Sequence, residues 1–100
     1  MTGLSYSGKL DYSGTGTIAA LNGSVITNTQ DGRSLASFTV TGTWVGTIIV
    51  EANIDGTTWF TTNAIDQADE SELTTFSTNK NIIVPCGSFN QVRLRASAYT

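Results

Sequence analysis

Short stretches in which apolar and polar residues alternate recur along the chain and are separated by Gly or Asn turns. Strict alternation over about four to eight residues is typical of a β-strand with one buried face. It is clearest at residues 34–41, 47–54 and 90–99. Shorter strand-like runs occupy residues 17–21, 24–27, 58–64, 73–77 and 81–84. Because no helical period of useful length appears, the pattern predicts an all-β fold.

Two dipeptides predict hairpin turns. Asn22-Gly23 lies between the runs 17–21 and 24–27, and Asp55-Gly56 lies between 47–54 and 58–64. Both dipeptides tolerate the positive φ that tight hairpin turns require. Along the strand before Asp55-Gly56 and along the last strand, one face is expected to carry only apolar side chains: Ile48, Val50, Ala52, Ile54, Val92, Leu94, Ala96 and Ala98.

The spacing of these strands predicts a single-domain antiparallel β-sandwich of jelly-roll or Ig-like type over residues 18–100. Residues 1–17 are rich in Gly and Ser and predict an extended N-terminal arm. One interpretation is a frayed terminus with a little local strand. The other is an arm that lies on a neighbouring subunit, because disordered linkers seldom carry large apolar side chains. Its partner-binding residues are then Leu4, Tyr6, Leu10 and Tyr12.

The composition narrows the class of protein. Seventeen Thr and ten Ser replace much of the usual charge, and β-branched Thr favours strands. A net charge of −3 with five basic residues predicts no binding of nucleic acid. No run of about eighteen apolar residues is present, so we expect no membrane span. With one cysteine and no signal-peptide pattern, we expect synthesis in a reducing cytoplasm without an intramolecular disulfide.

The residues needed for catalysis are scarce. The chain has no His, which excludes Ser-His-Asp and Cys-His arrangements. Cys86 is expected to be a small buried apolar residue. Glu51 and Asp55 could form a pair of acids, but Glu51 fits a solvated, outward strand position and Asp55 is explained by its turn. We therefore predict a protein without catalytic residues and without a cofactor.

An acidic segment follows the predicted hairpin. Residues 66–72 include Asp66, Asp69, Glu70 and Glu72, which offer oxygen ligands of the kind that Ca²⁺ prefers. Their spacing does not match the twelve-residue calcium loop, in which Gly occupies the middle. We expect a solvated loop and no metal site.

Four residues are candidates for a surface that binds a partner or a glycan: Trp44, Arg93, Arg95 and Tyr99. Aromatic rings stack on sugars, although Trp59 and Trp44 are also suited to the core or its edge. Arg93 and Arg95 share one face of the last strand and could bind carboxylates of a partner, or could instead be solvated with cross-strand partners.

One segment resembles a pattern found in virion proteins of tailed bacteriophages. It begins with Gly42-x-Trp44-x-Gly46-Thr47, continues through an apolar strand to Glu51-x-Asn53, and reaches Asp55-Gly56-x-x-Trp59. A closing strand, Val92-Arg93-Leu94-Arg95, leads to Tyr99. The resemblance implies a β-sandwich module of capsid decoration, head-fibre or tail proteins, and it implies no catalytic residue.

From the resemblance we expect a non-enzymatic virion structural protein, made in the host cytoplasm. A capsid decoration (cement) protein that stabilises the head through intersubunit contacts fits the short chain best. Its expected partners are the major capsid protein or other virion proteins. The chain is also expected to associate with further copies of itself, with a homotrimer favoured. The alternative function is a carbohydrate-binding module or a tail or fibre adhesion module.

Overall fold

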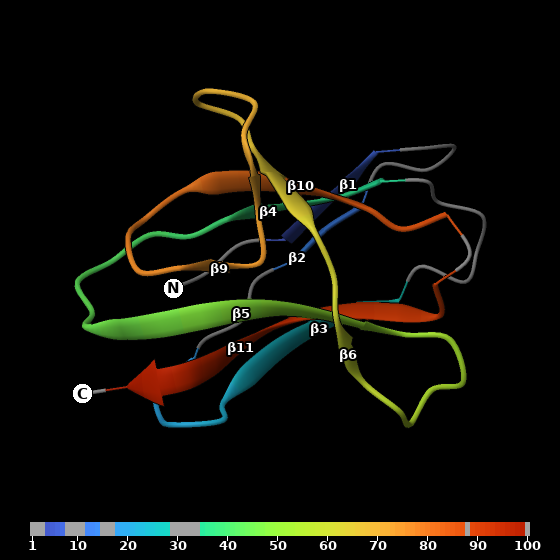
Figure 1. Cartoon of the computed structure of the whole chain (residues 1–100), viewed down its shortest axis with the longest axis horizontal. Helices are drawn as coiled ribbons and strands as arrows, with labels where there is room; N and C mark the ends of the chain where they lie inside the picture. The colour runs from blue at the N-terminus through green and yellow to red at the C-terminus, as the bar shows by residue number, and fades with distance from the viewer. Residues whose placement is uncertain (1–3, 8–11, 15–17, 29–34, 88, 100) are drawn as a thin grey trace.

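The structure is a computed structural model that describes residues 4–7, 12–14, 18–28, 35–87 and 89–99. Within these residues, eleven strands form two antiparallel sheets that face each other as a sandwich (Figure 1). The first strands are β1 (Leu4–Ser7), β2 (Tyr12–Gly14), β3 (Ser24–Asn28), β4 (Leu35–Thr39) and β5 (Gly46–Asn53). The others are β6 (Phe60–Thr61), β7 (Ala64–Asp66), β8 (Glu72–Leu73), β9 (Thr75–Phe76), β10 (Asn81–Pro85) and β11 (Gln91–Tyr99).

Sheet A has the strand order β2-β1-β4-β10-β7-β8, and sheet B has the order β3-β11-β5-β6, with β9 also pairing with β5. The predicted all-β fold is therefore confirmed at the level of two packed antiparallel sheets. No helix in the described ranges is long and apolar enough to cross a membrane.

The N-terminal segment contributes two strands to sheet A. The backbone of β1 pairs with β2 and with β4, where Leu4 lies opposite Phe38 and Tyr6 opposite Ala36. Tyr12 lies in β2, opposite Tyr6, whereas Leu10 lies outside the described residues. The contact of this segment with a second subunit stays a prediction.

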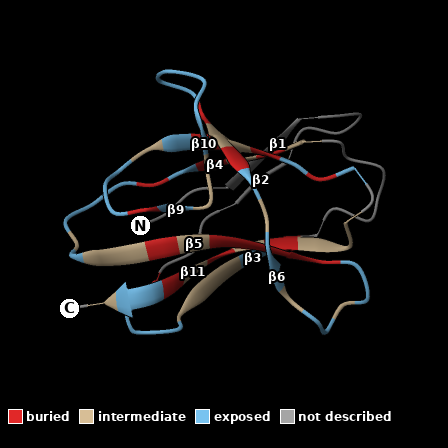
Figure 2. Cartoon of the chain, in the orientation of Figure 1, coloured by how far each residue is buried: buried red, intermediate tan, exposed pale blue. Residues whose placement is uncertain are grey.

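The clearest alternating patterns form the strands that were predicted from them. Phe38 and Val40 are buried in and next to β4 while Thr39 is exposed, and β5 and β11 are the longest strands of sheet B. Figure 2 shows that both sheets contain buried residues, and the buried apolar residues of the two sheets form one cluster. Two of the residues expected on the apolar strand faces are not buried with the others. Ile54 is 63% exposed because β5 ends at Asn53, and Ala98 is exposed because the β5–β11 register shifts between Ala96 and Ala98.

Two predicted continuous strands are divided between the sheets. In the run 58–64, β6 pairs with β5 in sheet B, and the chain then crosses to β7 in sheet A. In the run 73–77, β8 pairs with β7, and β9 pairs with β5. One edge of β5 is consequently covered in two halves, by β6 near Glu51 and by β9 near Ile48.

The Asn22-Gly23 dipeptide forms a turn, but the predicted hairpin with a strand over 18–21 is absent from the described residues. The N–H of Gly23 donates to the carbonyl of Ala20 at 3.0 Å. Asn22 has a φ of 65°, and its N–H donates to the carbonyl of Ala96, while the N–H of Ala96 donates to the carbonyl of Gly23. Two residues of the turn, Asn22 and Gly23, thus pair with one residue of β11, Ala96. This arrangement is a β-bulge, and it joins the turn to β11 rather than to a preceding strand.

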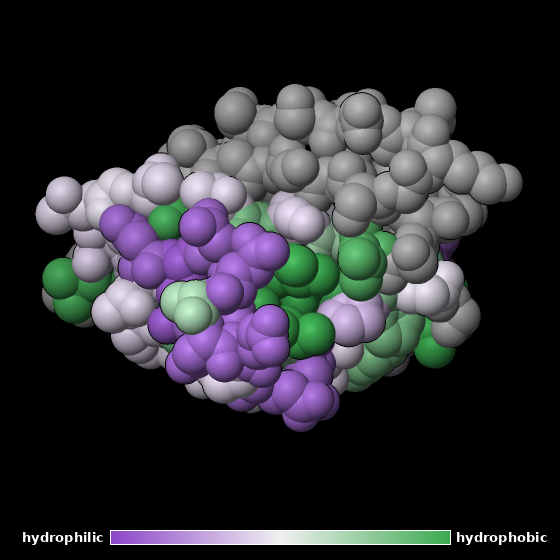
Figure 3. Space-filling view, turned by 90° about the horizontal axis from the view of Figure 1, so that it is seen from above, coloured by the Kyte–Doolittle hydropathy of each residue, from purple (hydrophilic) through white to green (hydrophobic). Residues whose placement is uncertain are grey.

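The loop after β7 projects from the outer side of sheet A. The acidic segment 66–72 was predicted to be an exposed loop; residues 67–72 are exposed, but the prediction is wrong for Asp66, which ends β7 and is 5% exposed. Seen from this side, hydrophilic side chains cover the surface around the loop, and a hydrophobic patch lies beside them (Figure 3).

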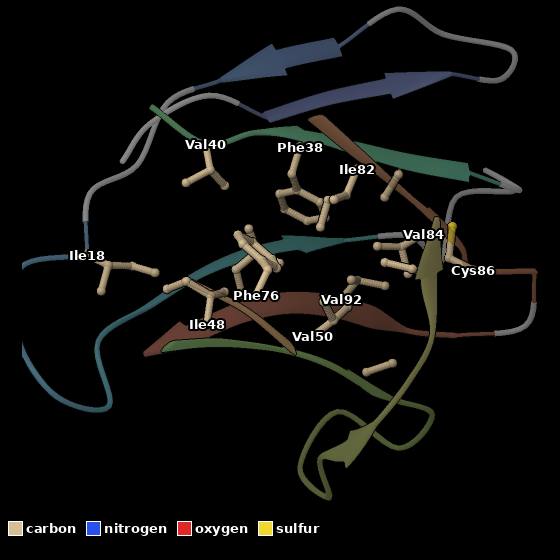
Figure 4. Packing of buried hydrophobic residues seen from close by; sticks show 14 of the residues in the cluster. Ile18, Phe38, Val40, Ile48, Val50, Phe76, Ile82, Val84, Cys86 and Val92 are labelled. Carbon is tan, nitrogen blue, oxygen red and sulfur yellow. The ribbon is translucent and has the colours of Figure 1, made fainter. Parts of the chain in front are cut away.

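The core fills the space between the sheets (Figure 4). Its largest fully buried apolar side chains are those of Phe38, Ile48, Val50, Ile82, Val84 and Val92. Burial of an aliphatic or aromatic side chain of this size contributes about 1.5–3 kcal/mol. Cys86 is fully buried in the same cluster, as predicted. The core is shared by both sheets, so the two layers pack against each other around one cluster.

Candidate functional site

The outer face of sheet B brings together a carboxylate and two guanidinium groups. Arg93 of β11 lies directly opposite Glu51 of β5, and Arg95 lies two residues further along β11. The Nε atoms of Arg93 and Arg95 donate to Oε1 of Glu51 at 2.8 and 2.9 Å, and Nη2 of Arg95 donates to Oε2 at 3.2 Å. Side chains at alternate strand positions share a face, which is why these groups meet on the side away from the core.

Two further side chains extend this group, which we call the Glu51 cluster: Asn22, Glu51, Trp59, Arg93 and Arg95. Nη1 of Arg95 donates to Oδ1 of Asn22 at 2.8 Å. The guanidinium carbon of Arg93 lies 4.0 Å from the ring centroid of Trp59, a cation–π contact. The cluster thus ties the turn before β3 and the segment before β6 to the two central strands of sheet B.

The electrostatics of the cluster keep Glu51 ionised. Burial by itself raises the pKa of Glu51, but hydrogen bonds from Arg95 and Arg93 and their positive charges outweigh it and hold the pKa below its ordinary value. A general acid needs a raised pKa to hold its proton at neutral pH. The arrangement therefore suits Glu51 to ion pairing and not to proton donation.

The prediction that Glu51 is a solvated strand residue is wrong. It is 7% exposed, because the side chains of Arg93 and Arg95 lie across it from the neighbouring strand. Trp59 was expected in the core, but it is half-buried on the outer face of sheet B beneath Arg93. The prediction that Arg93 and Arg95 share one face is confirmed, and their carboxylate partner belongs to the same chain.

The other two predicted surface residues lie at a different end of the sandwich. Trp44 and Tyr99 are half-buried and pack against the edge of the core. Nε1 of Trp44 donates to Oδ1 of Asn79 at 2.6 Å, and Tyr99 pairs with Gly46 at the start of β5. The four residues expected to form one surface thus form two separate groups.

Asp55 has the role in its turn that the sequence predicted. Its Oδ1 accepts hydrogen bonds from the backbone N–H groups of Thr58 and Thr57 at 2.7 and 2.9 Å. These bonds lower the pKa of Asp55 to about 2. Because its carboxylate is directed at its own turn, Asp55 does not form a pair with Glu51.

Asp66 differs from the rest of the acidic segment. It is only 5% exposed, since it ends β7, and Nζ of Lys80 lies 2.8 Å from its Oδ2. The hydrogen bond from Lys80 lowers the pKa of Asp66. Asp69 accepts hydrogen bonds from the hydroxyl and N–H of Ser71, which lower its pKa. In the described residues, no three His, Cys, Asp or Glu side chains form a group that could hold a metal ion.

Sequence reasoning missed the contributions of Asn22, Asn79 and Lys80. Asn79 fixes Trp44, and its Nδ2 donates to the carbonyl of Gly42 at 2.9 Å. The contacts of Asn79 and Asn22 join residues more than thirty positions apart, and Lys80 contacts a residue 14 positions away, so no local pattern reveals them. The one local signal was the Asn22-Gly23 dipeptide, which predicts a positive φ but not the contact with Arg95.

Comparisons with known proteins identify no family. No protein-family model matches the chain, and neither a curated protein nor a solved structure matches it.

Proposed function

We propose that the chain is a non-enzymatic structural protein of a tailed-phage virion, and specifically a capsid decoration protein that stabilises the head through intersubunit contacts. The resemblance of residues 42–59 and 91–99 to virion modules supports the proposal. The distribution of apolar side chains on the surface supports the mode of action, which is assembly.

One observation carries the assembly role. Among the described residues, the exposed large hydrophobic side chains are Leu21, Ile26, Val45, Ile54 and Phe60. All but Leu21, which lies in the turn before β3, are in or next to a strand of sheet B. Val45 and Ile54 flank the two ends of β5 and are 65% and 63% exposed. Exposed apolar side chains along one layer are removed from water when a partner subunit covers them, which favours association. Sheet B is therefore the layer that we propose to face a partner subunit.

The described carboxylates support a structural role for the charged groups. Glu51 is neutralised by two arginines, Asp66 by Lys80, and Asp55 accepts hydrogen bonds within its turn. Each group stabilises a connection between strands or within a loop. Such contacts hold the shape of an assembly surface.

The finer features of the proposal concern topology and partners. We propose a sandwich of jelly-roll or Ig-like type, in which residues 1–17 also reach a neighbouring subunit as an arm. The partners are the major capsid protein or other virion proteins, and further copies of the chain in a trimer. The location is the virion, after synthesis in the host cytoplasm.

The alternative function is a carbohydrate-binding module or a tail or fibre adhesion module. The aromatic residues give it limited support, because Trp59 lies beneath Arg93 while Trp44 and Tyr99 lie at another end of the sandwich. They do not provide a single stacking surface for a sugar chain.

Purified phage particles whose genome encodes this chain provide the test. Quantitative mass spectrometry should find the chain in many copies per particle, and cryo-electron microscopy should find density for a small β-sandwich on the outer capsid surface. Density on the tail alone would favour the adhesion module. Absence of the chain from purified particles would refute a virion role.

A further inference from the structure

A groove opens at the base of the loop that follows β7, on the side of the molecule opposite to the Glu51 cluster. It has a volume of about 450 Å³ and is lined by Asp66, Gln67, Ala68, Asn79, Lys80 and Asn81. Pockets that bind small molecules span roughly 300–1,000 Å³. The groove is thus large enough for a small ligand. None of its lining residues belongs to the Glu51 cluster on sheet B.

Amide side chains dominate the polar lining. Gln67, Asn79 and Asn81 are all exposed, and each amide carries both a donor and an acceptor without a net charge. The charge of Lys80 is neutralised by Asp66 at 2.8 Å. Paired donors and acceptors of this kind match neighbouring hydroxyl groups, each of which both donates and accepts.

An apolar hollow continues from the groove. It measures about 400 Å³ and is lined by Ile65, Gln67, Glu70 and Ile83, so Gln67 is shared by both. Ile65 and Ile83 lie directly opposite each other on β7 and β10 and are half-buried. The hydrophilic surface and the hydrophobic patch beside it are visible in Figure 3. A ligand with polar edges and aliphatic C–H faces would satisfy both parts.

The groove is held in shape before any ligand binds. The N–H of Gln67 donates to the carbonyl of Asn81 at 3.0 Å, and the N–H of Val40 donates to the carbonyl of Lys80 at 2.9 Å. Both polar atoms of the Asn79 amide are held, since Oδ1 accepts from Trp44 and Nδ2 donates to the carbonyl of Gly42. Groups that are already ordered lose little entropy on binding, which favours affinity.

The local charge selects against anions. Asp69 and Glu70 lie in the loop above the groove, and Glu72 begins β8 directly after it. Within the described part of this surface Lys80 is the basic residue, already paired with Asp66. Like charges raise the free energy of binding for phosphates, sulfates and carboxylates. The chemistry of the groove therefore favours an uncharged ligand with many hydroxyl groups.

We propose that this groove binds a neutral oligosaccharide, with Gln67 and Asn81 as its principal hydrogen-bonding residues and Ile65 and Ile83 as its apolar floor. This activity goes beyond the assembly role and uses the opposite face of the sandwich. A virion subunit could then bind a partner through sheet B and a glycan through sheet A.

The test is an NMR titration of the full chain with neutral hexasaccharides of glucose, mannose, xylose and N-acetylglucosamine, each to about 10 mM. The variants are Gln67→Ala and Asn81→Ala, and the matched control is Asn63→Ala, an exposed Asn between β6 and β7. Shifts of the amides at 65–68 and 79–83 with at least one sugar are expected. Loss of a ligand hydrogen bond should weaken binding roughly tenfold in each groove variant and leave the control unchanged.

Three results would overturn the proposal. One is the absence of shifts with every neutral sugar, and another is shifts confined to Trp44, Trp59 or Tyr99. The third is tighter binding of hexagalacturonate, which is anionic, than of any neutral sugar. None of these results bears on whether the chain is found in purified virions, so the failure of the glycan site and the failure of the virion role are distinguishable.

Discussion

Replacement of Glu51 by Gln tests whether the Glu51 cluster holds sheet B together. Glu51→Gln keeps the size of the side chain but removes the negative charge that two arginines share. The amide oxygen can still accept from both Nε atoms, as Oε1 does, but an amide nitrogen in place of Oε2 cannot accept from Nη2 of Arg95, and neutral acceptors bind guanidinium groups more weakly than a carboxylate. Arg93 and Arg95 then lie close together on one face of β11 without a counter-charge.

The expected cost follows from the geometry of the three hydrogen bonds. Hydrogen bonds to charged groups contribute about 1.5–3 kcal/mol when water is excluded, while exposed ion pairs contribute about 0–1 kcal/mol. The side chain of Glu51 is 9% exposed, but those of Arg93 and Arg95 are 19% and 25% exposed. Solvent therefore screens each pair in part, and we expect a total loss of about 2 kcal/mol in the free energy of unfolding.

Urea denaturation at pH 7, followed by tryptophan fluorescence, measures this loss. The matched control is Glu72→Gln, an exposed carboxylate in β8, which should change the free energy of unfolding by less than about 0.5 kcal/mol. A double variant, Glu51→Gln with Arg95→Gln, should lose less than the sum of the two single variants, because the two groups interact directly. A change in Glu51→Gln no larger than in the control would refute the view that the cluster stabilises the sheet.

Two other perturbations follow from single contacts. A Cβ at Gly46 would lie 2.2 Å from the carbonyl oxygen of Ala98 at the β5–β11 irregularity, so Gly46→Ala should destabilise the protein by about 2 kcal/mol. Gly87→Ala meets no atom within 4 Å and should leave the melting temperature nearly unchanged in the same thermal denaturation series. The pKa values of Glu51, Asp55, Asp66 and Asp69 lie below their unfolded values of 4.5 for Glu and 3.8 for Asp. The stability that these groups contribute is therefore present above about pH 5 and lost as pH falls through 4.5 towards 2. A free energy of unfolding, measured in urea, that increases as the pH falls over this interval would contradict these pKa directions.

The alternation of apolar and polar residues predicted the strands that have one solvent-exposed face and one buried face. Residues 34–41, 47–54 and 90–99 correspond to β4, β5 and β11. Buried and less buried positions alternate along most of β4 and β11, whereas β5 is buried at every position from Val50 to Asn53. The positions that failed lie at irregularities. Ile54 follows the end of β5, and Ala98 follows the register shift, so neither continues the alternation.

The local sequence pattern could not predict that short strand-like runs are divided between the two sheets. A run such as 58–64 has the composition of a strand, but it does not reveal that β6 pairs in sheet B and β7 in sheet A. The pairing of β9 with β5 likewise depends on the whole sandwich. Sequence separation, not residue type, limited the prediction here.

The candidate site shows the same limit. Glu51 looks like a solvated residue when only its strand is considered, and it becomes buried only when β11 places Arg93 and Arg95 beside it. Their shared face on β11 was predictable from alternation. The register that aligns Arg93 with Glu51 is a tertiary property, so the cluster could not be assembled from the sequence alone.

Sedimentation equilibrium of the purified full chain, at concentrations up to about 100 µM, tests most directly the claim that this protein works by assembly. We predict a trimer or larger particle, because we propose that sheet B and residues 1–17 make contacts between subunits. A monomer at every concentration would contradict assembly through copies of the chain.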